Sequence, residues 1–399
     1  MSNAHPLLTP VRVAGAELPN RVAVAPMSRV STAGDGVPTD AMVDYYASYA
    51  RGGFGLIVSE GTYTDHAHSQ AYPNQPAIVT DEQVRAWARV TDAVHAAGGR
   101  IFLQLMHAGA LVQGNHHRDV AVAPSAVQPL GRKLLGYGGE GPYAMPREMT
   151  LGDVEEAVAG FAASAARART AGFDGVEVHG ANGYLLDQFL TTYTNRRTDA
   201  YGGSPANRAR IFVEVLEAIR AAAGDDFPVG VRVSQVKVND LEYRWSGPEE
   251  AREIFERLAA GGPAYVHVAS EGAHWDETSF LAPGVSITGL AREVTGAPVI
   301  ANGGMHDERL AARVLDDGHA DLVSLGHGAL ANPDWPQRLA AGRRFAEFDP
   351  DMLRPEVTIE NTLAWRRDRR ERAAGAYDEA VLAAAADSRD GDRVPAGGA

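Results

Sequence analysis

The chain has 399 residues, no cysteine and a formal net charge of −14 at pH 7, and no apolar run is as long as a membrane span. The lack of cysteine excludes disulfides, thiolate nucleophiles and cysteine-bound iron–sulfur clusters, so redox chemistry would need an organic cofactor or a metal held by nitrogen and oxygen ligands. The acidic balance disfavours nucleic acid as a partner, because proteins that bind phosphate backbones are normally basic.

Short β-branched or apolar segments alternate with amphipathic segments along most of the chain. Eight are predicted as strands: Arg21–Ala25, Gly55–Ser59, Arg100–Leu105, Asp174–His179, Val229–Val233, Tyr265–Ala269, Pro298–Ala301 and Asp321–Leu325. The helical patterns between them include Thr80–Ala97, Leu151–Ala171, Pro205–Ala223, Pro248–Ala260 and His306–Asp317. Apolar strands that alternate with helices indicate a parallel sheet covered on its outside. Eight such units predict an α/β fold of the (β/α)8 TIM barrel type, with a doubly wound sheet as the competing architecture.

Four segments are surplus to the barrel repeat. Val11–Leu18 has the pattern of a small N-terminal hairpin that would close the bottom of the barrel. Leu111–Met149 is a Gly- and Pro-rich excursion after the third strand, and Ser270–Ser286 follows the sixth strand. Long irregular segments in compact domains often form lids or binding loops. Beyond about Arg354 we expect a C-terminal helix, Trp365–Arg372, and a disordered tail.

Polar residues and glycines stand where the predicted strands end. Barrel enzymes place their active sites at these ends. The residues found there are Ser28, Gly61, Gln104, His179, Arg232, Ser270, Gly303, Gly304, Gly326 and His327. Glycine lets the backbone approach a ligand closely, and backbone donors after the last two strands commonly bind phosphate in barrels. A flat ligand with hydrogen-bonding edges and a phosphate would use all of these positions.

The fourth predicted strand leads into the run Gly175–Tyr184, which brings a histidine, an amide and a phenol close together in the sequence: His179, Asn182 and Tyr184. Two hydrogen-bond donors at a strand end could hold a carbonyl oxygen while a phenol delivers a proton nearby. In a regular helix His179 and Asn182 would share a face that Tyr184 does not. The glycines at 180 and 183 therefore favour an irregular turn.

Several ordered segments between about Leu7 and Arg343 match the motifs of one family. They include Ala25-Pro26-Met27-Ser28-Arg29, Gln104-Leu105-Met106-His107-Ala108-Gly109, Ala171–His179 with Asn182–Leu190, and Asn195–Ser204. In these segments the chain resembles the Old Yellow Enzyme family of flavin mononucleotide (FMN)-dependent ene-reductases. The resemblance implies a single FMN-binding TIM barrel over residues 1–354, with residues 355–399 forming the C-terminal helix and tail.

The resemblance also implies how the cofactor is held. The run Pro26-Met27-Ser28 would flank the flavin, and Gly61 and Gln104 would address its pyrimidine edge. Arg232 would lie near N1 and O2, where a fixed cation stabilises the anionic reduced flavin. FMN is thus the implied cofactor, with NADPH or NADH as the reductant.

The same resemblance gives the catalytic roles. His179 and Asn182 would bind the carbonyl or nitro oxygen of the substrate, and Tyr184 would be the proton donor. The implied reaction is the NAD(P)H-dependent reduction of the activated C=C bond in an α,β-unsaturated carbonyl or nitro compound. Hydride would pass from flavin N5 to Cβ and a proton from Tyr184 to Cα. A phenol near its ordinary pKa is a weak acid, adequate for a carbanion-like acceptor.

The phosphate end departs from the family pattern. Gly303, Gly304 and Gly326 fall where the family binds phosphate, but His327 stands where the family usually has arginine. Histidine offers fewer donors than arginine and is only partly charged near neutral pH. We therefore expect weaker or more pH-dependent retention of FMN.

Two loops are expected to select the substrate through residues such as Tyr137, His274 and Trp275. The run Gly136–Gly141 satisfies G-x-G-x-x-G, but no strand precedes it and no helix follows, so we interpret it as a loop and not as a dinucleotide fingerprint. His306 has no assigned chemistry, and we expect it at the surface or in packing.

Two other functions stay open: a flavin-dependent desaturase or isomerase of a biosynthetic pathway, and a flavin-binding protein without catalysis. The expected partner is a small-molecule activated alkene, with neither nucleic acid nor membrane. No basic segment followed by an apolar stretch opens the chain, so the predicted location is cytoplasmic. The physiological substrate, the choice of NADH or NADPH and the formation of a homo-oligomer are not determined by the sequence.

Overall fold

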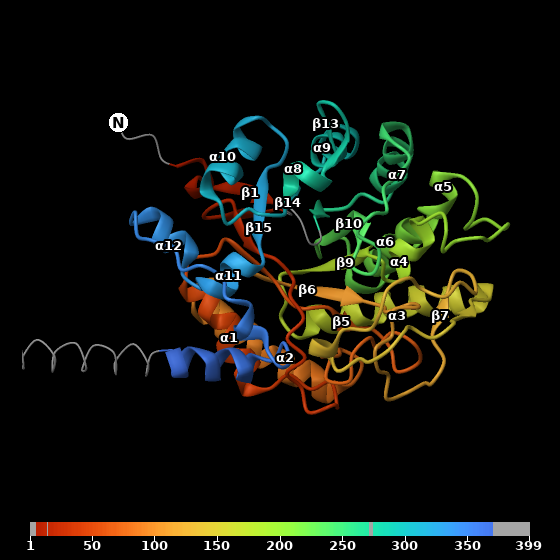
Figure 1. Cartoon of the computed structure of the whole chain (residues 1–399), viewed down its shortest axis with the longest axis horizontal. Coiled ribbons are helices and arrows are strands. Elements are labelled where there is room, and N and C mark those ends of the chain that lie inside the picture. The colour runs from red at the N-terminus through yellow and green to blue at the C-terminus, as the bar shows by residue number, and fades with distance from the viewer. Residues whose placement is uncertain (1–4, 14, 271–273, 370–399) are drawn as a thin grey trace, which may run out of the picture.

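The computed structural model describes residues 5–13, 15–270 and 274–369. Within these ranges, eight parallel strands follow one another in the order β4-β3-β15-β14-β11-β10-β9-β6, and β6 pairs with β4 to close a barrel (Figure 1). The strands are β3 (Val22–Val24), β4 (Leu56–Val58), β6 (Ile101–Met106), β9 (Gly175–Asn182), β10 (Val229–Lys237), β11 (Tyr265–Ala269), β14 (Val299–Asn302) and β15 (Leu322–Leu325). The predicted TIM barrel is confirmed, and the doubly wound sheet is excluded because the sheet closes on itself.

Long helices cover the outside of the barrel, and shorter ones lie in the loops between strands and helices (Figure 1). They are α1 (Asp40–Arg51), α2 (Asp81–Ala96), α3 (Leu151–Thr170), α4 (Leu185–Leu190), α5 (Pro205–Arg208), α6 (Arg210–Ala223), α7 (Pro248–Ala260), α8 (Trp275–Thr278), α9 (Ile287–Thr295), α10 (Glu308–Asp316), α11 (His327–Ala331) and α12 (Trp335–Ala340). Thr80 and Thr150 begin α2 and α3 with capping boxes. The single helix predicted over Pro205–Ala223 is wrong, because the backbone of Ala209 (ψ −4°) ends α5 before α6 begins.

Short strands and 3-10 helices (η) lie outside the barrel repeat. They are η1 (Pro6–Leu8), β1 (Val11–Val13), β2 (Ala16–Leu18), β5 (Thr62–Tyr63), β7 (Val122–Ala123), η2 (Leu135–Tyr137), β8 (Arg147–Glu148), β12 (Phe280–Ala282), β13 (Val285–Ser286) and η3 (Pro350–Leu353). The strands β1 and β2 form the predicted hairpin. Val13 and Leu18 of this hairpin pack with interior barrel residues such as Leu56, Tyr265 and Leu322, which lie at the N-terminal ends of their strands. The hairpin therefore closes the bottom of the barrel, as expected.

Side chains on the barrel strands alternate between two environments, as the pleat of a strand requires. On β9, Val176 and Val178 pack into the large core beneath the helices. Glu177 and His179 face the inside of the barrel, where both are buried. The same alternation on neighbouring strands directs a set of polar side chains toward the carboxyl ends of the strands.

Residues 355–369 pack back onto the barrel. The guanidinium of Arg29 donates to the backbone oxygens of Val357 (2.8 Å) and Thr358 (2.7 Å). Residues 359–369 are helical, and Arg366 donates to the carbonyl of Leu330 at 2.6 Å. The predicted C-terminal helix is confirmed as far as residue 369. Its last turn and the predicted tail lie outside the described residues, and the domain boundary at residue 354 stays a prediction.

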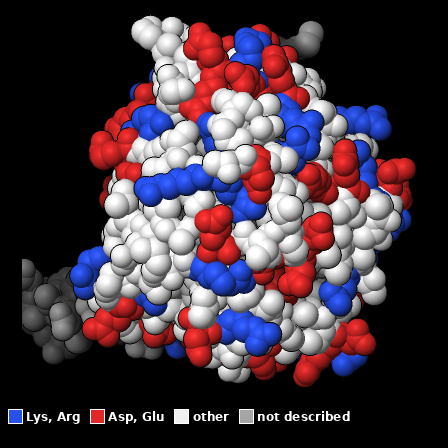
Figure 2. Space-filling model, turned by 90° about the vertical axis from the view of Figure 1, so that its right-hand side faces the viewer, with Lys and Arg blue, Asp and Glu red and all other residues white. Residues whose placement is uncertain are grey.

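Charged side chains of both signs are interspersed on the face shown in Figure 2. Among the described residues, no helix combines the length and the apolar character needed to cross a membrane. The described residues also contain no group of three or more His, Cys, Asp or Glu side chains that could hold a metal ion.

Candidate functional site

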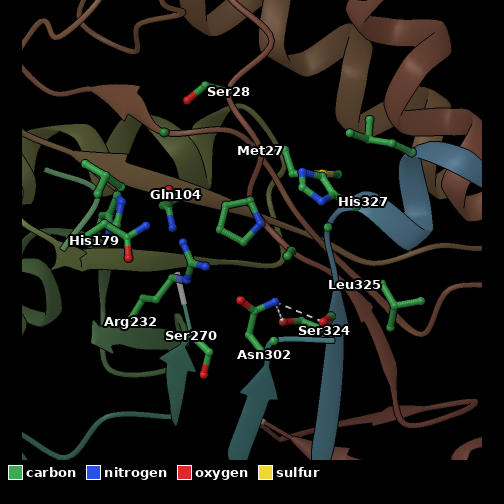
Figure 3. A pocket seen from close by; sticks show the side chains of 18 of the residues that line it. Met27, Ser28, Gln104, His179, Arg232, Ser270, Asn302, Ser324, Leu325 and His327 are labelled. Carbon is green, nitrogen blue, oxygen red and sulfur yellow. Dashed lines mark hydrogen bonds between the residues drawn. The ribbon is translucent and has the colours of Figure 1, made fainter. Parts of the chain in front are cut away.

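A cavity of about 430 Å³ opens at the carboxyl ends of the barrel strands (Figure 3). Its volume lies in the range typical of small-molecule and cofactor sites. Every site residue predicted from the sequence lines it: Pro26, Met27, Ser28, Gly61, Gln104, His179, Asn182, Tyr184, Arg232, Gly303, Gly304, Gly326 and His327. The barrel brings them together because each follows, or ends, a strand of the same closed sheet.

The turn after β9 places three of these side chains on the cavity wall. Asn182 and Gly183 both have left-handed backbones, with φ values of 63° and 86°. Asparagine tolerates this conformation better than most residues. The Gly183 N–H donates to Oδ2 of Asp187 at 2.7 Å, and Tyr184 then begins α4 as its N-cap. The irregular turn expected from the glycines is present, and it directs Tyr184 to the same space as His179.

His179 is a neutral hydrogen-bond donor. Burial, together with the charge of Arg232, lowers the pKa of His179 to about 3. Its Nδ1 accepts a hydrogen bond from the Ala181 N–H at 3.4 Å, so the proton of the neutral ring resides on Nε2. The ring therefore offers one N–H to an oxygen in the cavity without bringing a charge.

Tyr184 is paired with a second tyrosine. The hydroxyls of Tyr184 and Tyr72 share a hydrogen bond, and the Tyr184 ring lies 5.1 Å from the His179 ring. Burial and the neighbouring Tyr72 raise the pKa of Tyr184 well above 10. The expectation of an ordinary phenol pKa is therefore wrong, because a buried tyrosinate would lose its hydration beside another phenol. Tyr184 stays protonated across the neutral and mildly alkaline range.

Sequence reasoning did not identify Tyr72 or Met106 as cavity residues. Tyr72 is 2% exposed and stacks on Tyr137 of η2, with ring centroids 4.9 Å apart. It lies between β5 and α2, where neither strand alternation nor a helical period marks it. Its position depends on packing against the excursion that follows β6, which no local pattern could have shown.

Gln104 and Arg232 form part of the cavity floor. Nε2 of Gln104 donates to Oε1 of Glu177 at 2.8 Å, so its Oε1 is the atom that lies toward Gly61 and the cavity. Arg232 on β10 is 5% exposed and stands in register with His179 on β9. Figure 3 shows the side chains of Gln104, His179 and Arg232 converging on one side of the cavity.

His327 lies on the opposite side of the cavity (Figure 3), and Gly303, Gly304 and Gly326 are also among the lining residues. Gly303 and Gly304 have φ values of 108° and 71°, and a Cβ at Gly303 would lie 2.5 Å from the Cβ of Ser270. These positions therefore require glycine. His327 is exposed and stacks on Phe348 with ring centroids 4.0 Å apart. Partial burial and the charge of His306 lower the pKa of His327, which favours its neutral form.

Loop residues complete the cavity. His306, expected at the surface or in packing, is exposed but also lines the cavity, and its ring lies 6.5 Å from that of His274. His274 and Tyr137, which were expected to contact substrate, line the cavity as well. Trp275 instead packs in the core, with its ring 5.0 Å from that of Phe280.

A buried carboxylate holds the loop after β3, which carries Pro26–Ser28. Oε2 of Glu60 accepts the backbone N–H groups of Arg29 (2.8 Å) and Val30 (3.2 Å), and Oε1 accepts the hydroxyl of Tyr46 (3.2 Å). Val30 has a φ of 38°, which is strained for a β-branched residue. Burial raises the pKa of Glu60 to about 7.

A family model described as the NADH:flavin oxidoreductase / NADH oxidase family matches residues 6–345. A probable flavin mononucleotide-dependent alkene reductase of Leishmania infantum is 38% identical over 350 residues, which is 86% of this chain and 93% of that protein. The Old Yellow Enzyme homologue from Zymomonas mobilis superposes with a TM-score of 0.79 at 32% identity, over 88% of this chain and 96% of that one. Morphinone reductase in complex with tetrahydroNAD superposes with a TM-score of 0.74 at 35% identity, over 87% and 93%.

Proposed function

The chain belongs to the NADH:flavin oxidoreductase / NADH oxidase family, that of the Old Yellow Enzymes, and is an FMN-dependent enzyme with a nicotinamide reductant; we propose that it reduces the activated C=C bond of α,β-unsaturated carbonyl or nitro compounds. One observation carries this proposal. The neutral donor His179 and the protonated phenol of Tyr184 line the same cavity as the floor residues Gln104 and Arg232.

The chemistry of the described residues fits FMN. The carbonyl oxygen of Gln104 suits the N–H group of the flavin pyrimidine, and the cation of Arg232 suits its oxygen-bearing edge. At the other side, Gly303 and Gly304 line the cavity after β14, at a strand end where barrels commonly bind phosphate through backbone N–H groups. We propose that Pro26-Met27-Ser28, Gly61, Gly326 and His327 complete the FMN site. When bound, FMN supplies the hydride that the substrate receives at Cβ.

His179 and Asn182 are proposed to hold the oxygen of the substrate. Two donors on one oxygen polarise the conjugated C=C bond and stabilise the negative charge that develops on the oxygen as Cβ is reduced. A neutral His179 suits this role, since it keeps its proton on Nε2 and stays a donor throughout the neutral range.

Tyr184 is proposed to donate a proton to Cα. The raised pKa makes Tyr184 a weak acid, which matches a strongly basic acceptor such as the α carbon of an enolate or nitronate. The O–H bond of Tyr184 breaks as the new C–H bond forms, and the Tyr72 hydroxyl can donate to the resulting phenolate. The product gains one hydride and one proton.

The proposal is tested on the purified protein without oxygen. Its visible spectrum is recorded, NADPH or NADH is added, and then cyclohexenone or a nitroalkene. We expect the flavin absorbance to bleach with the nicotinamide and to return with the alkene. A flavin that bleaches but is reoxidised by none of these alkenes would contradict ene-reduction. A flavin that neither nicotinamide bleaches would favour a desaturase or isomerase, or binding without catalysis. The cytoplasmic location and a homo-oligomeric state stay predictions.

A further inference from the structure

A connected layer of buried polar side chains lies between the bottom of the barrel and the floor of the cavity. Its members are Gln104, Glu177, Tyr265, His267, Asn302 and Ser324, which come from β6, β9, β11, β14 and β15. Barrel interiors are usually filled with branched apolar side chains. Burying a charged group at this depth costs desolvation free energy, and apolar side chains would stabilise the barrel as well. The layer is therefore better explained by a role in the site above it.

Glu177 is the centre of this layer. Its side chain has no exposed surface. Oε1 accepts Nε2 of Gln104 at 2.8 Å, and Oε2 accepts the hydroxyl of Tyr265 at 3.0 Å and Nδ1 of His267 at 2.9 Å. Burial acts to raise its pKa, but the hydrogen bond from His267, the charge of Arg232 and the hydrogen bond from Gln104 outweigh burial and bring the pKa of Glu177 down to about 2. The carboxylate is therefore ionised throughout the neutral range.

The hydrogen bonds of the layer run in one direction, toward Glu177. Burial lowers the pKa of His267, so its ring is neutral; its Nδ1–H donates to the carboxylate and its Nε2 accepts the hydroxyl of Ser324 at 2.8 Å. Nδ2 of Asn302 in turn donates to Oγ of Ser324 at 3.1 Å and to the backbone oxygen of Ser324 at 3.1 Å, as the dashed lines in Figure 3 show.

The polar layer affects the cavity in two ways. Gln104 and Asn302 both commit their NH₂ groups to the layer, so both present carbonyl oxygens as acceptors to the space above. Arg232 acts on Glu177 through its charge, so the cation that faces the cavity has a buried anion behind it. An anion behind a cation reduces the positive potential that a ligand in the cavity experiences.

We propose that Glu177 is a positioning residue for FMN, which fixes Gln104 and Asn302 as acceptors toward the cofactor and offsets the charge of Arg232. This inference rests on the proposed function, because it takes the cavity as the FMN site. Reduced FMN is anionic and gains more from Arg232 than oxidised FMN does. The carboxylate therefore holds the midpoint potential of the bound flavin below the value that Arg232 alone would give.

The test is Glu177→Gln, which keeps the shape and removes the charge. We expect the ratio of affinities for reduced over oxidised FMN to rise about tenfold, a shift of about 30 mV to more positive potential for a two-electron couple. The potential is measured by redox titration against a reference dye. The affinity for oxidised FMN is measured separately on the apoprotein by flavin fluorescence.

Two control variants separate the effect of the Glu177 charge on the flavin potential from a general loss of stability. Glu250→Gln removes another buried carboxylate, one that is paired with Arg208 and does not line the cavity. It is expected to lower stability and leave the potential unchanged. Tyr265→Phe removes one donor but keeps the charge of Glu177, and it is expected to change the affinity ratio by less than about twofold.

Each outcome decides the inference. An unshifted potential in Glu177→Gln, or an equal shift in Glu250→Gln, would overturn it. If Glu177→Gln does not fold, Ser324→Ala replaces it: the loss of the link between His267 and Asn302 is expected to weaken oxidised and reduced FMN about equally, by about threefold. Unchanged affinity in that variant would overturn the positioning role. A wild-type protein that binds no FMN would contradict the proposed function instead.

Discussion

The two ends of the cavity are built in different ways. At one end His179 and Tyr184 are 3% and 7% exposed, and hydrogen bonds and ring contacts fix their orientation. At the other end His306 and His327 are exposed, and glycines from two strand ends, Gly303, Gly304 and Gly326, form part of the lining. The comparison indicates that the proposed substrate end is preorganised. The proposed phosphate end would depend more on the charge that the ligand itself brings.

The loop after β3 connects the two ends. Ser28 interacts with Tyr72 beside Tyr184, the proposed proton donor, whereas the sulfur of Met27 lies near Gly326 at the proposed phosphate end. The conformation of this loop depends on Glu60, a buried carboxylate with a raised pKa. The three regions should therefore respond differently to substitution and to pH.

The largest effect is expected at the preorganised end, in Tyr184→Phe. Loss of the proton donor should lower the rate of alkene reduction about 10²- to 10⁴-fold, while NADPH reduces the flavin as before. Stopped-flow absorbance separates the two half-reactions. Tyr72→Phe is the matched control, because it removes the neighbouring hydroxyl and keeps the donor; its effect should be smaller. Unchanged alkene reduction in Tyr184→Phe would exclude it as the donor.

An intermediate effect is expected at the connecting loop. The pKa of Glu60 is raised from 4.5 to about 7, so its contribution to stability is present at acid pH and is lost as pH rises through this interval. The free energy of unfolding of wild type relative to Glu60→Gln should therefore fall by about 1.4 kcal/mol per pH unit, or about 3 kcal/mol in all. Urea denaturation at pH 5 and pH 8 measures this difference. A difference that stays constant would show that Glu60 is ionised in the folded protein.

The smallest effect is expected at the phosphate end. His327 has a lowered pKa without ligand, and a bound phosphate dianion favours its protonated form, so FMN should bind about tenfold more tightly at pH 6 than at pH 8. His327→Arg should remove this dependence and gain about tenfold in affinity at pH 8. Apoprotein titrations with FMN measure both quantities. Equal affinity at the two pH values, with no gain in the variant, would mean that His327 does not contact the phosphate.

The sequence predicts the barrel and the cavity residues at the strand ends well, because both depend on local patterns, but it misses lining residues such as Tyr72. Strand periodicity fixes where each strand ends, and closure of the sheet brings Gln104, His179 and Arg232 together. The pKa of Tyr184 could not be predicted, since its shift comes from burial beside Tyr72, a residue 112 positions away in the chain. The partners of Glu177 were hidden for the same reason, because Tyr265 and His267 lie 88 and 90 positions away.

The hydrogen bonds from Arg29 to the backbone oxygens of Val357 and Thr358 have a practical consequence. Arg29 is adjacent to Ser28, and Val357 itself lines the cavity. The helical stretch 359–369 begins two residues after Val357, and the Ile359 N–H donates to Oγ of Ser31 at 2.9 Å, so the stretch supports the cavity wall from behind. Shortened or fused versions of the protein, made for crystallisation or biocatalysis, should retain the chain through residue 369, and a purification tag belongs beyond that point.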